Sequence, residues 1–202
     1  LPKGELVYPL SQHIGAPATP IVAVGDSVLK GQKIAEAGGF VSAPIHASVS
    51  GTVKKIEPRR VPTGDMVNSI VIESDGEFKE VEYQAVEDVS ALSKEEIINR
   101  IKEAGVVGMG GAGFPTHVKL SPKEPEKIDY IIANCAECEP YLTSDYRIML
   151  DHTEELVEGM RIILSMFEHA KGVFAVENNK PDCIAKLLEL TKDEPRMEVA
   201  PL

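Results

Sequence analysis

The first part of the chain shows short apolar runs with no helical period. The runs are rich in β-branched residues and cover residues 21–24, 49–56 and 70–72. Turn-forming pairs separate them, such as Gly25-Asp26 and Asp75-Gly76. Dense turn signals between short β-branched runs are typical of a compact barrel or sandwich. We therefore predict an all-β domain over residues 1–84.

The pattern changes to helical spacing at residue 93. Ser93, followed three residues later by Glu96, is a capping box that begins a helix, and Gly105 is suited to end it. Residues 154–167 carry apolar side chains at the spacing of one helix face, which indicates ordinary core packing. Pro181 suits the first turn of a last helix.

Two buried-type strands are predicted between these helices, at residues 128–133 and 173–176. Strands that alternate with helices at this spacing indicate a parallel α/β sheet. The predicted fold is therefore α+β in two parts, with a partial Rossmann-like α/β domain over residues 93–202. Residues 198–202 alternate like the start of another strand. We therefore expect the chain to be a fragment of a longer protein.

Composition and charge exclude several classes of protein. No run approaches the ~18 apolar residues of a membrane span, and no signal peptide begins the sequence. Three cysteines in 202 residues do not make a disulfide scaffold. The 21 basic and 32 acidic residues give a formal charge of −11. Phosphate contacts need a basic face, so we expect no nucleic-acid partner.

Residues 24–34 and 43–53 resemble the barrel-sandwich fold of biotinyl and lipoyl carrier domains. Such domains present a modified lysine on the hairpin between these stretches. The hairpin here, residues 35–42, contains no lysine. We therefore expect a structural or docking module rather than a carrier. His46 lacks partners at ligand spacing and is interpreted as a packed or surface histidine.

Residues 105–120 form a glycine-rich segment with five glycines in nine residues. Glycines permit positive φ and bring backbone N–H groups close to a phosphate, which a following helix N-terminus would also favour. Lys119 could supply a point charge to the phosphate, and Phe114 could stack on a ring. The alternative is a plain turn between packed elements. The candidate phosphate-binding glycines are Gly108, Gly110, Gly111 and Gly113.

Polar residues follow both predicted strands, where open α/β sheets bind ligands. Asn134, Glu137 and Glu139 come after the first strand and offer hydrogen bonds to a flavin edge or to sugar hydroxyls. Glu177 and Asn178 come after the second strand. For these two, a helix cap before the proline and a contact with flavin or dinucleotide remain equal alternatives.

The first of these loops also contains a C-x-x-C motif, formed by Cys135 and Cys138. A redox disulfide or half of a metal site is the less favoured interpretation, because Cys183 is the only other thiol. Small side chains beside a cofactor explain both cysteines. We predict no metal site and no catalytic acid or base in this chain, because it has no G-x-S-x-G or H-E-x-x-H motif and no Cys/His pair at a suggestive spacing.

Residues 108–120 and 131–147 resemble the FMN-binding blocks of the NADH-binding subunit of respiratory complex I and its relatives. The resemblance is greatest to the RnfC subunits of Rnf electron-transport complexes, which also begin with a barrel-sandwich domain. It implies that the glycines and Lys119 surround FMN, that Asn134 and Glu137 line it, and that Glu139 lies on the nicotinamide side. The relatives keep a cysteine at Cys138. The complex I relatives carry an aspartate and an arginine where Ala136 and Met109 stand here.

The same resemblance implies a function. FMN and NAD(H) are the expected cofactors, and the 4Fe-4S clusters of the full-length protein lie outside these residues. The expected reaction couples ferredoxin, indirectly, to NAD⁺ with ion translocation. The expected partners are the other subunits of a membrane complex, with this subunit peripheral on the cytoplasmic face. Alternatives are a corrinoid or other NADH-dependent reductase subunit, or a non-catalytic scaffold. The family draws further FMN contacts from later segments, so we expect this chain alone to bind FMN weakly and to be inactive.

Overall fold

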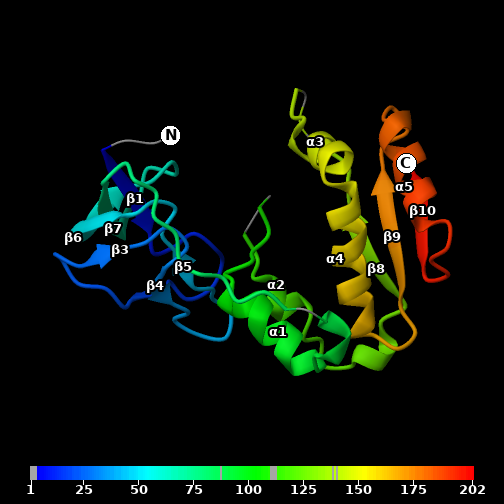
Figure 1. Ribbon diagram of the computed structural model, residues 1–202, viewed down its shortest axis with the longest axis horizontal. Coiled ribbons are helices and arrows are strands. Elements are labelled where there is room, and N and C mark those ends of the chain that lie inside the picture. Colours follow the sequence, from blue (N-terminus) through cyan, green and yellow to red (C-terminus); the bar gives the residue numbers. More distant parts are fainter. Residues whose placement is uncertain (1–3, 87, 110–112, 138, 140) are drawn as a thin grey trace. The chain divides into compact units, whose positions relative to one another are not determined.

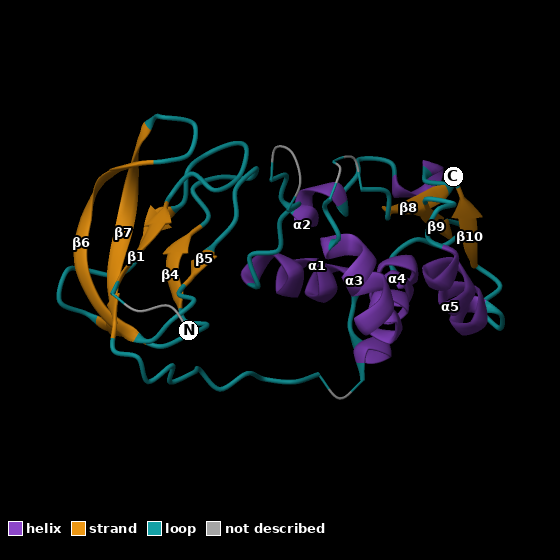
Figure 2. Cartoon of the chain, turned by 90° about the horizontal axis from the view of Figure 1, so that it is seen from above, coloured by secondary structure: helices purple, strands orange, loops and turns teal. Residues whose placement is uncertain are grey.

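The computed structural model of the 202-residue chain describes residues 4–86, 88–109, 113–137, 139 and 141–202. It divides into two compact units (Figures 1 and 2). The barrel unit comprises Leu1–Asp88 and Glu95–Pro122, and the α/β unit comprises Val89–Lys94 and Lys123–Leu202. Each unit is described by itself below.

The barrel unit contains two antiparallel sheets, as the short β-branched runs predict. The larger sheet has the order β1-β7-β6-β3, and the smaller has the order β2-β4-β5. Its core consists of apolar side chains that include Ile34, Val53 and Ile70, each 0% exposed. The strands are β1 (Glu5–Pro9), β2 (Thr19–Pro20), β3 (Ser27–Val28), β4 (Lys33–Glu36), β5 (Ile45–His46), β6 (Gly51–Arg60) and β7 (Met66–Ser74).

Two helices belong largely to the barrel unit. Helix α1 (Lys94–Glu103) begins directly after Ser93, and Gly105 follows it with a φ of +69°. Lys33 on β4 pairs with Glu103 at the end of α1, with 2.8 Å between Nζ and Oε2. Helix α2 (Thr116–Lys119) is a single turn. The boundary between the compact units therefore differs from the domain boundary that the sequence pattern predicts, because residues 95–122 belong to the barrel unit. The domains at residues 1–84 and 93–202 remain a prediction.

The α/β unit is built on a parallel sheet with the order β10-β9-β8. The predicted strands and helices are present, and the alternating residues at the end of the chain form β10. One helix, α3, was not predicted. The elements are η1 (Val89–Ala91), η2 (Pro125–Lys127), β8 (Tyr130–Asn134), α3 (Ser144–Asp151), α4 (Thr153–Ser165), β9 (Lys171–Val176), α5 (Pro181–Thr191) and β10 (Met197–Pro201).

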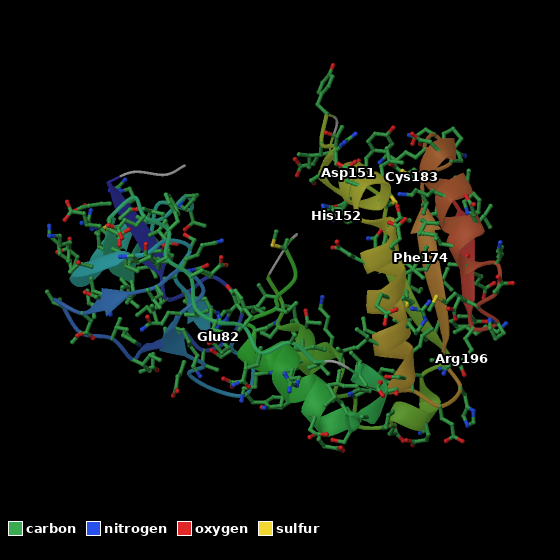
Figure 3. The ribbon with its side chains drawn as sticks, in the orientation of Figure 1. Glu82, Asp151, His152, Phe174, Cys183 and Arg196 are labelled. Carbon is green, nitrogen blue, oxygen red and sulfur yellow. The ribbon has the colours of Figure 1, made fainter. Side chains whose placement is uncertain are left out.

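The helices α3, α4 and α5 lie on the same side of this sheet (Figure 2). Gly172 on β9 allows α4 to approach, because a Cβ atom there would lie 2.7 Å from the sulfur of Met160. Phe174, two residues further along the same strand face, is 0% exposed and points toward α4 (Figure 3). The buried face of α4 therefore packs against the sheet, as its apolar spacing predicts. The carboxyl ends of β8 and β9 lead into the loops that carry the candidate site residues.

Candidate functional site

The glycine-rich loop closes on itself within the barrel unit. The Gly108 N–H donates to the Phe114 carbonyl at 2.9 Å, and the Thr116 N–H donates to the Val106 carbonyl at 3.0 Å. Gly113 has a φ of +61°, a conformation that favours glycine. Gly110 and Gly111 lie outside the described residues. The described ends of the loop therefore form a narrow backbone hairpin that includes Gly108.

Lys119 extends over Gly108. A Cβ atom on Gly108 would lie 3.5 Å from Lys119 Nζ and 3.6 Å from the Phe114 nitrogen. The Lys119 ammonium, the Phe114 nitrogen and, at 3.7 Å, the Phe114 carbonyl oxygen thus surround the position that a side chain at Gly108 would take. The Lys119 side chain is exposed, and no carboxylate pairs with it among the residues that the structure describes. This arrangement fits a phosphate group.

The expected contribution of a helix N-terminus is not supported. Helix α2 follows the loop, but it is only four residues long. The helix macrodipole depends on aligned peptide units over several turns, so a single turn adds little. The prediction of an anion-binding site therefore depends on Lys119 and on the backbone of the loop.

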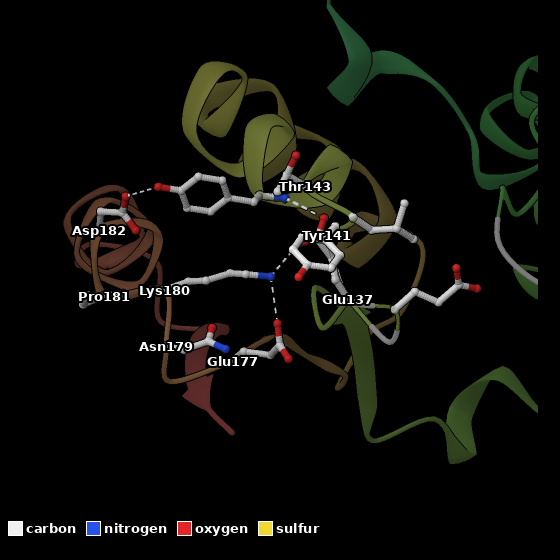
Figure 4. Close-up of a pocket in the computed structure, with 11 residues that line it drawn as sticks. Glu137, Tyr141, Thr143, Glu177, Asn179, Lys180, Pro181 and Asp182 are labelled. Carbon is white, nitrogen blue, oxygen red and sulfur yellow. Dashed lines mark hydrogen bonds and ion pairs between the residues drawn. The ribbon is translucent and has the colours of Figure 1, made fainter.

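In the α/β unit, the strand ends border a cavity of about 800 Å³ (Figure 4). The cavity brings together Glu137, Glu139 and Glu177 of the predicted site. Asn134 and Asn178 are exposed and do not line it. Cys138 lies outside the described residues. The lining residues are Glu137, Glu139, Tyr141, Leu142, Thr143, Tyr146, Glu177, Asn179, Lys180, Pro181 and Asp182.

Glu137 is held by three partners within the protein. Its Oε2 lies 2.6 Å from Lys180 Nζ, and its Oε1 accepts the N–H groups of Asp145 at 2.9 Å and Tyr146 at 3.3 Å. The Glu137 side chain is only 5% exposed. The hydrogen bond from Lys180, helped by the two backbone N–H groups, lowers the pKa of Glu137. Both oxygens are already bonded, so a contact with a ligand would have to share one of them.

Lys180 joins the loops that follow β8 and β9. Its ammonium also lies 2.7 Å from Glu177 Oε2, and its side chain is 13% exposed (Figure 4). Burial opposes the charge on Lys180, but the two carboxylates outweigh this effect and raise its pKa. Glu137 and Lys180 therefore stay charged at neutral pH. The cluster of Glu137, Lys180 and Glu177, here called the lysine bridge, holds the two loops together at the cavity wall.

The structure decides one of the alternatives for Glu177 and Asn178. The residue that caps helix α5 is Lys180, and no side chain makes a capping hydrogen bond there. An asparagine cap before Pro181 is therefore wrong. The contact of Glu177 and Asn178 with flavin or dinucleotide remains a prediction. Asn134 uses its side-chain oxygen to accept the Ala136 N–H at 3.2 Å, which shapes the start of its loop.

The sequence pattern missed several lining residues. The Tyr146 hydroxyl donates to Asp182 Oδ2 at 2.6 Å, which ties α3 to the first turn of α5. Lys180 lies in the polar run after the second strand. Its place directly before Pro181 was the one feature of the sequence that could have identified it as a residue of the cavity wall. Its two carboxylate partners lie at different distances along the chain, one of them 43 residues away.

The cysteines of the described chain give no support to redox or metal chemistry. Cys135 and Cys183 are free, buried thiols. Burial, with smaller effects from Asp145 and Cys183, raises the pKa of Cys135 to about 11. Among the described residues, no group of three or more His, Cys, Asp or Glu side chains could hold a metal ion.

Residues 101–202 match the family model of the Nuo51 FMN-binding domain, and residues 1–77 match that of the RnfC barrel sandwich hybrid domain. The chain is 45% identical over 202 residues to the C subunit of the Na(+)-translocating ferredoxin:NAD(+) oxidoreductase complex of Acetobacterium woodii, covering 98% of this chain and 45% of that protein. It is 48% identical over 181 residues to the proton-translocating counterpart of Clostridium ljungdahlii, covering 89% and 40%.

A third relative, the C subunit of the ion-translocating oxidoreductase complex of Haemophilus influenzae, is 40% identical over 190 residues, which cover 93% of this chain and 29% of that protein. The chain thus spans less than half the length of these relatives. The match to the Nuo51 family model confirms the predicted FMN-binding type of domain, and the match to the RnfC family model confirms the predicted barrel sandwich. Within the part of the chain that the structure describes, no helix is both long and apolar enough to cross a membrane.

Proposed function

Because the chain belongs to the family of the Nuo51 FMN-binding domain, preceded by the barrel sandwich domain of RnfC-type subunits, we propose that it is the flavin-binding part of the RnfC-type subunit of an ion-translocating ferredoxin:NAD⁺ oxidoreductase complex. The relatives from Acetobacterium woodii and Clostridium ljungdahlii carry this activity in their names. The observation that best supports the proposal is the exposed Lys119 ammonium over Gly108.

The described residues suit different parts of FMN. Gly108 and Lys119 would bind the phosphate, and the half-buried Phe114 would contact the ring system. In the α/β unit, the exposed Asn134 and Glu139 are separate candidates, on the resemblance alone, for hydrogen bonds to a flavin and to a nicotinamide. When bound, FMN accepts or donates a hydride and passes on single electrons. The protein's own contribution is to bind and orient this group.

The wider role of the protein extends this proposal. We propose that NAD(H) is the second ligand, that the iron–sulfur clusters lie in the remainder of the full-length subunit, and that ferredoxin exchanges electrons with the complex indirectly. The subunit would be peripheral, on the cytoplasmic face of the membrane, and held there by the membrane-bound subunits. The Rossmann-like character of the α/β domain belongs to this proposal, and the parallel β8–β9–β10 sheet supports it.

The first prediction tests FMN binding in the full-length subunit that contains this chain. We expect added FMN to lose fluorescence on binding. Lys119→Glu should weaken FMN binding roughly tenfold to a hundredfold, because it replaces an attractive charge at the phosphate with a repulsive one. Isothermal or fluorescence titration measures both affinities.

Lys123→Glu is a matched control, because Lys123 is also exposed and the charge change is identical. We expect it to bind FMN like the wild type. No binding of FMN by the wild-type subunit would refute the proposed function. Equal affinities for Lys119→Glu and the wild type would refute only the phosphate role of Lys119.

A further inference from the structure

Helix α2, at the end of the glycine-rich loop, is anchored to the hairpin that lacks a lysine. His117 is 5% exposed, and its Nε2 lies 3.3 Å from the Phe40 carbonyl oxygen on the hairpin of residues 35–42. A carbonyl can only accept a hydrogen bond, so Nε2 must carry the proton. Burial lowers the pKa of His117 and so favours the neutral ring, whose buried Nδ1 has no hydrogen-bond partner among the described residues.

Glycines bring the loop against the barrel at two further points. A Cβ atom on Gly113 would lie 3.0 Å from the Gln12 carbonyl oxygen and 3.2 Å from His13 Cα. A Cβ atom on Gly105 would lie 2.7 Å from the Pro44 carbonyl oxygen. A side chain at either position would push the loop away from the barrel. The loop is therefore fitted to the barrel surface before, within and after its glycine run.

The barrel side of these contacts is itself fixed. Ser42 is 0% exposed, and its hydroxyl oxygen accepts the Gly38 N–H at 2.9 Å, which braces the hairpin from within. His13 is also buried. Its Nδ1–H donates to the Ile14 carbonyl at 3.1 Å, and its Nε2 accepts the Ala43 N–H at 3.1 Å. Two buried histidines, His13 and His117, thus connect the hairpin and its following residue to the segments that contact the loop.

We propose that the hairpin of residues 35–42, where carrier domains present their modified lysine, serves in this protein as the support of the glycine-rich loop, with His117 as the positioning residue. The barrel strands would then set the distance between Lys119 and Gly108, and this distance would determine the affinity for a phosphate group. The second half of this inference rests on the proposed function. The support itself does not depend on any ligand.

The first experiment needs no ligand and uses the full-length subunit. Hydrogen–deuterium exchange is compared between the wild type, His117→Leu and His117→Gln. Leucine removes the donor, so amides of residues 116–120 should exchange about fivefold faster, the effect of losing one typical hydrogen bond. Glutamine places an N–H at a similar reach and should restore the protection. His169→Leu, at an exposed histidine, is the control and should change nothing in this segment.

The second experiment compares FMN with riboflavin, which lacks the phosphate. His117→Leu should weaken FMN binding about fivefold and leave riboflavin binding within about twofold, and His117→Gln should restore FMN affinity. A general loss of structure would weaken both ligands alike. Should His117→Leu not fold, Ser42→Ala loosens the same hairpin without changing the loop, and the same pattern is expected.

The outcomes separate the two proposals. Unchanged exchange in His117→Leu overturns the support. Faster exchange with an unchanged ratio of FMN to riboflavin affinity overturns the positioning of the phosphate grip. If the wild type binds no FMN, the proposed function fails, and the exchange data still decide whether the hairpin supports the loop.

Discussion

At the scale of single residues, burial decides which thiols can react. Cys135 is 6% exposed and Cys183 is 0% exposed. Only the thiolate is nucleophilic, and with a pKa of about 11 roughly one thousandth of Cys135 is ionised at pH 8. We expect iodoacetamide to leave both cysteines unmodified in the folded chain at pH 8. Both should be alkylated after unfolding in guanidinium, as peptide mass spectrometry would show.

Labelling of Cys135 should increase as the pH rises toward its pKa, because the thiolate fraction grows tenfold with each pH unit below that value. A Cys138→Ser variant removes the thiol that lies outside the described residues and keeps the assignment simple. Rapid modification of Cys135 in the folded chain at pH 8, at the rate of free glutathione, would contradict the burial argument and reopen a redox role for the C-x-x-C motif.

Glu137 shows how far sequence reasoning reaches at this scale. The resemblance implies that this carboxylate lines the flavin, and the structure places it in the loop after β8, at the wall of the cavity. Its bonds to Lys180 and to the first turn of α3 could not be inferred from its neighbours in the sequence. Local patterns identify a strand end, whereas the partners of a buried charge depend on how distant segments fold together.

At the scale of secondary structure, two glycines allow a matched test of how α4 packs. One lies within α4, and the other packs against it from β9. Gly159 lies in α4, and a Cβ atom there would meet nothing within 4 Å. Gly159→Ala should raise the free energy of unfolding by about 0.5–1 kcal/mol, because glycine is a poor residue for a helix interior. Gly172→Ala should lower it by about 1–3 kcal/mol, because the added methyl group crowds Met160 and Leu164.

Urea unfolding of the two variants measures both changes. Each variant serves as the control for the other, because the substitution is the same, Gly159 lies in α4, and Gly172 packs against α4. A stabilising effect at both positions would show that α4 can shift away from β9 at little cost. That result would contradict the close packing of this helix on the sheet.

The long periodic elements were the predictable part of the fold. The apolar face of α4 and the short strands β8 and β9 follow directly from the spacing of their residues. Helix α3 was missed because its eight residues carry a single fully buried side chain, Met149, which gives no period to detect. The shortness of α2 was missed for a related reason, since glycine patterns indicate where a helix begins and not how long it is.

At the scale of the whole molecule, the residues that the structure describes form one hydrophobic core in the barrel unit and another in the α/β unit. The barrel core includes Ile70, and the core of the α/β unit includes Phe174, and both side chains are 0% exposed. The two compact units share no residue. Compact units with their own cores commonly unfold as separate cooperative steps. We therefore predict two transitions in calorimetric unfolding of the chain.

Core substitutions assign these transitions to the units. Ile70→Ala should destabilise the barrel unit by about 2–5 kcal/mol, and Phe174→Ala should destabilise the α/β unit by about 3–5 kcal/mol, through lost burial and the cavities left behind. Each variant should lower the midpoint of one transition and leave the other within about 1 °C of the wild-type value, because sites without shared partners act independently. A single transition that both variants lower would instead mean that the two units unfold as one cooperative structure. In that case a substitution in either core would lower the stability of both the lysine bridge and the glycine-rich loop.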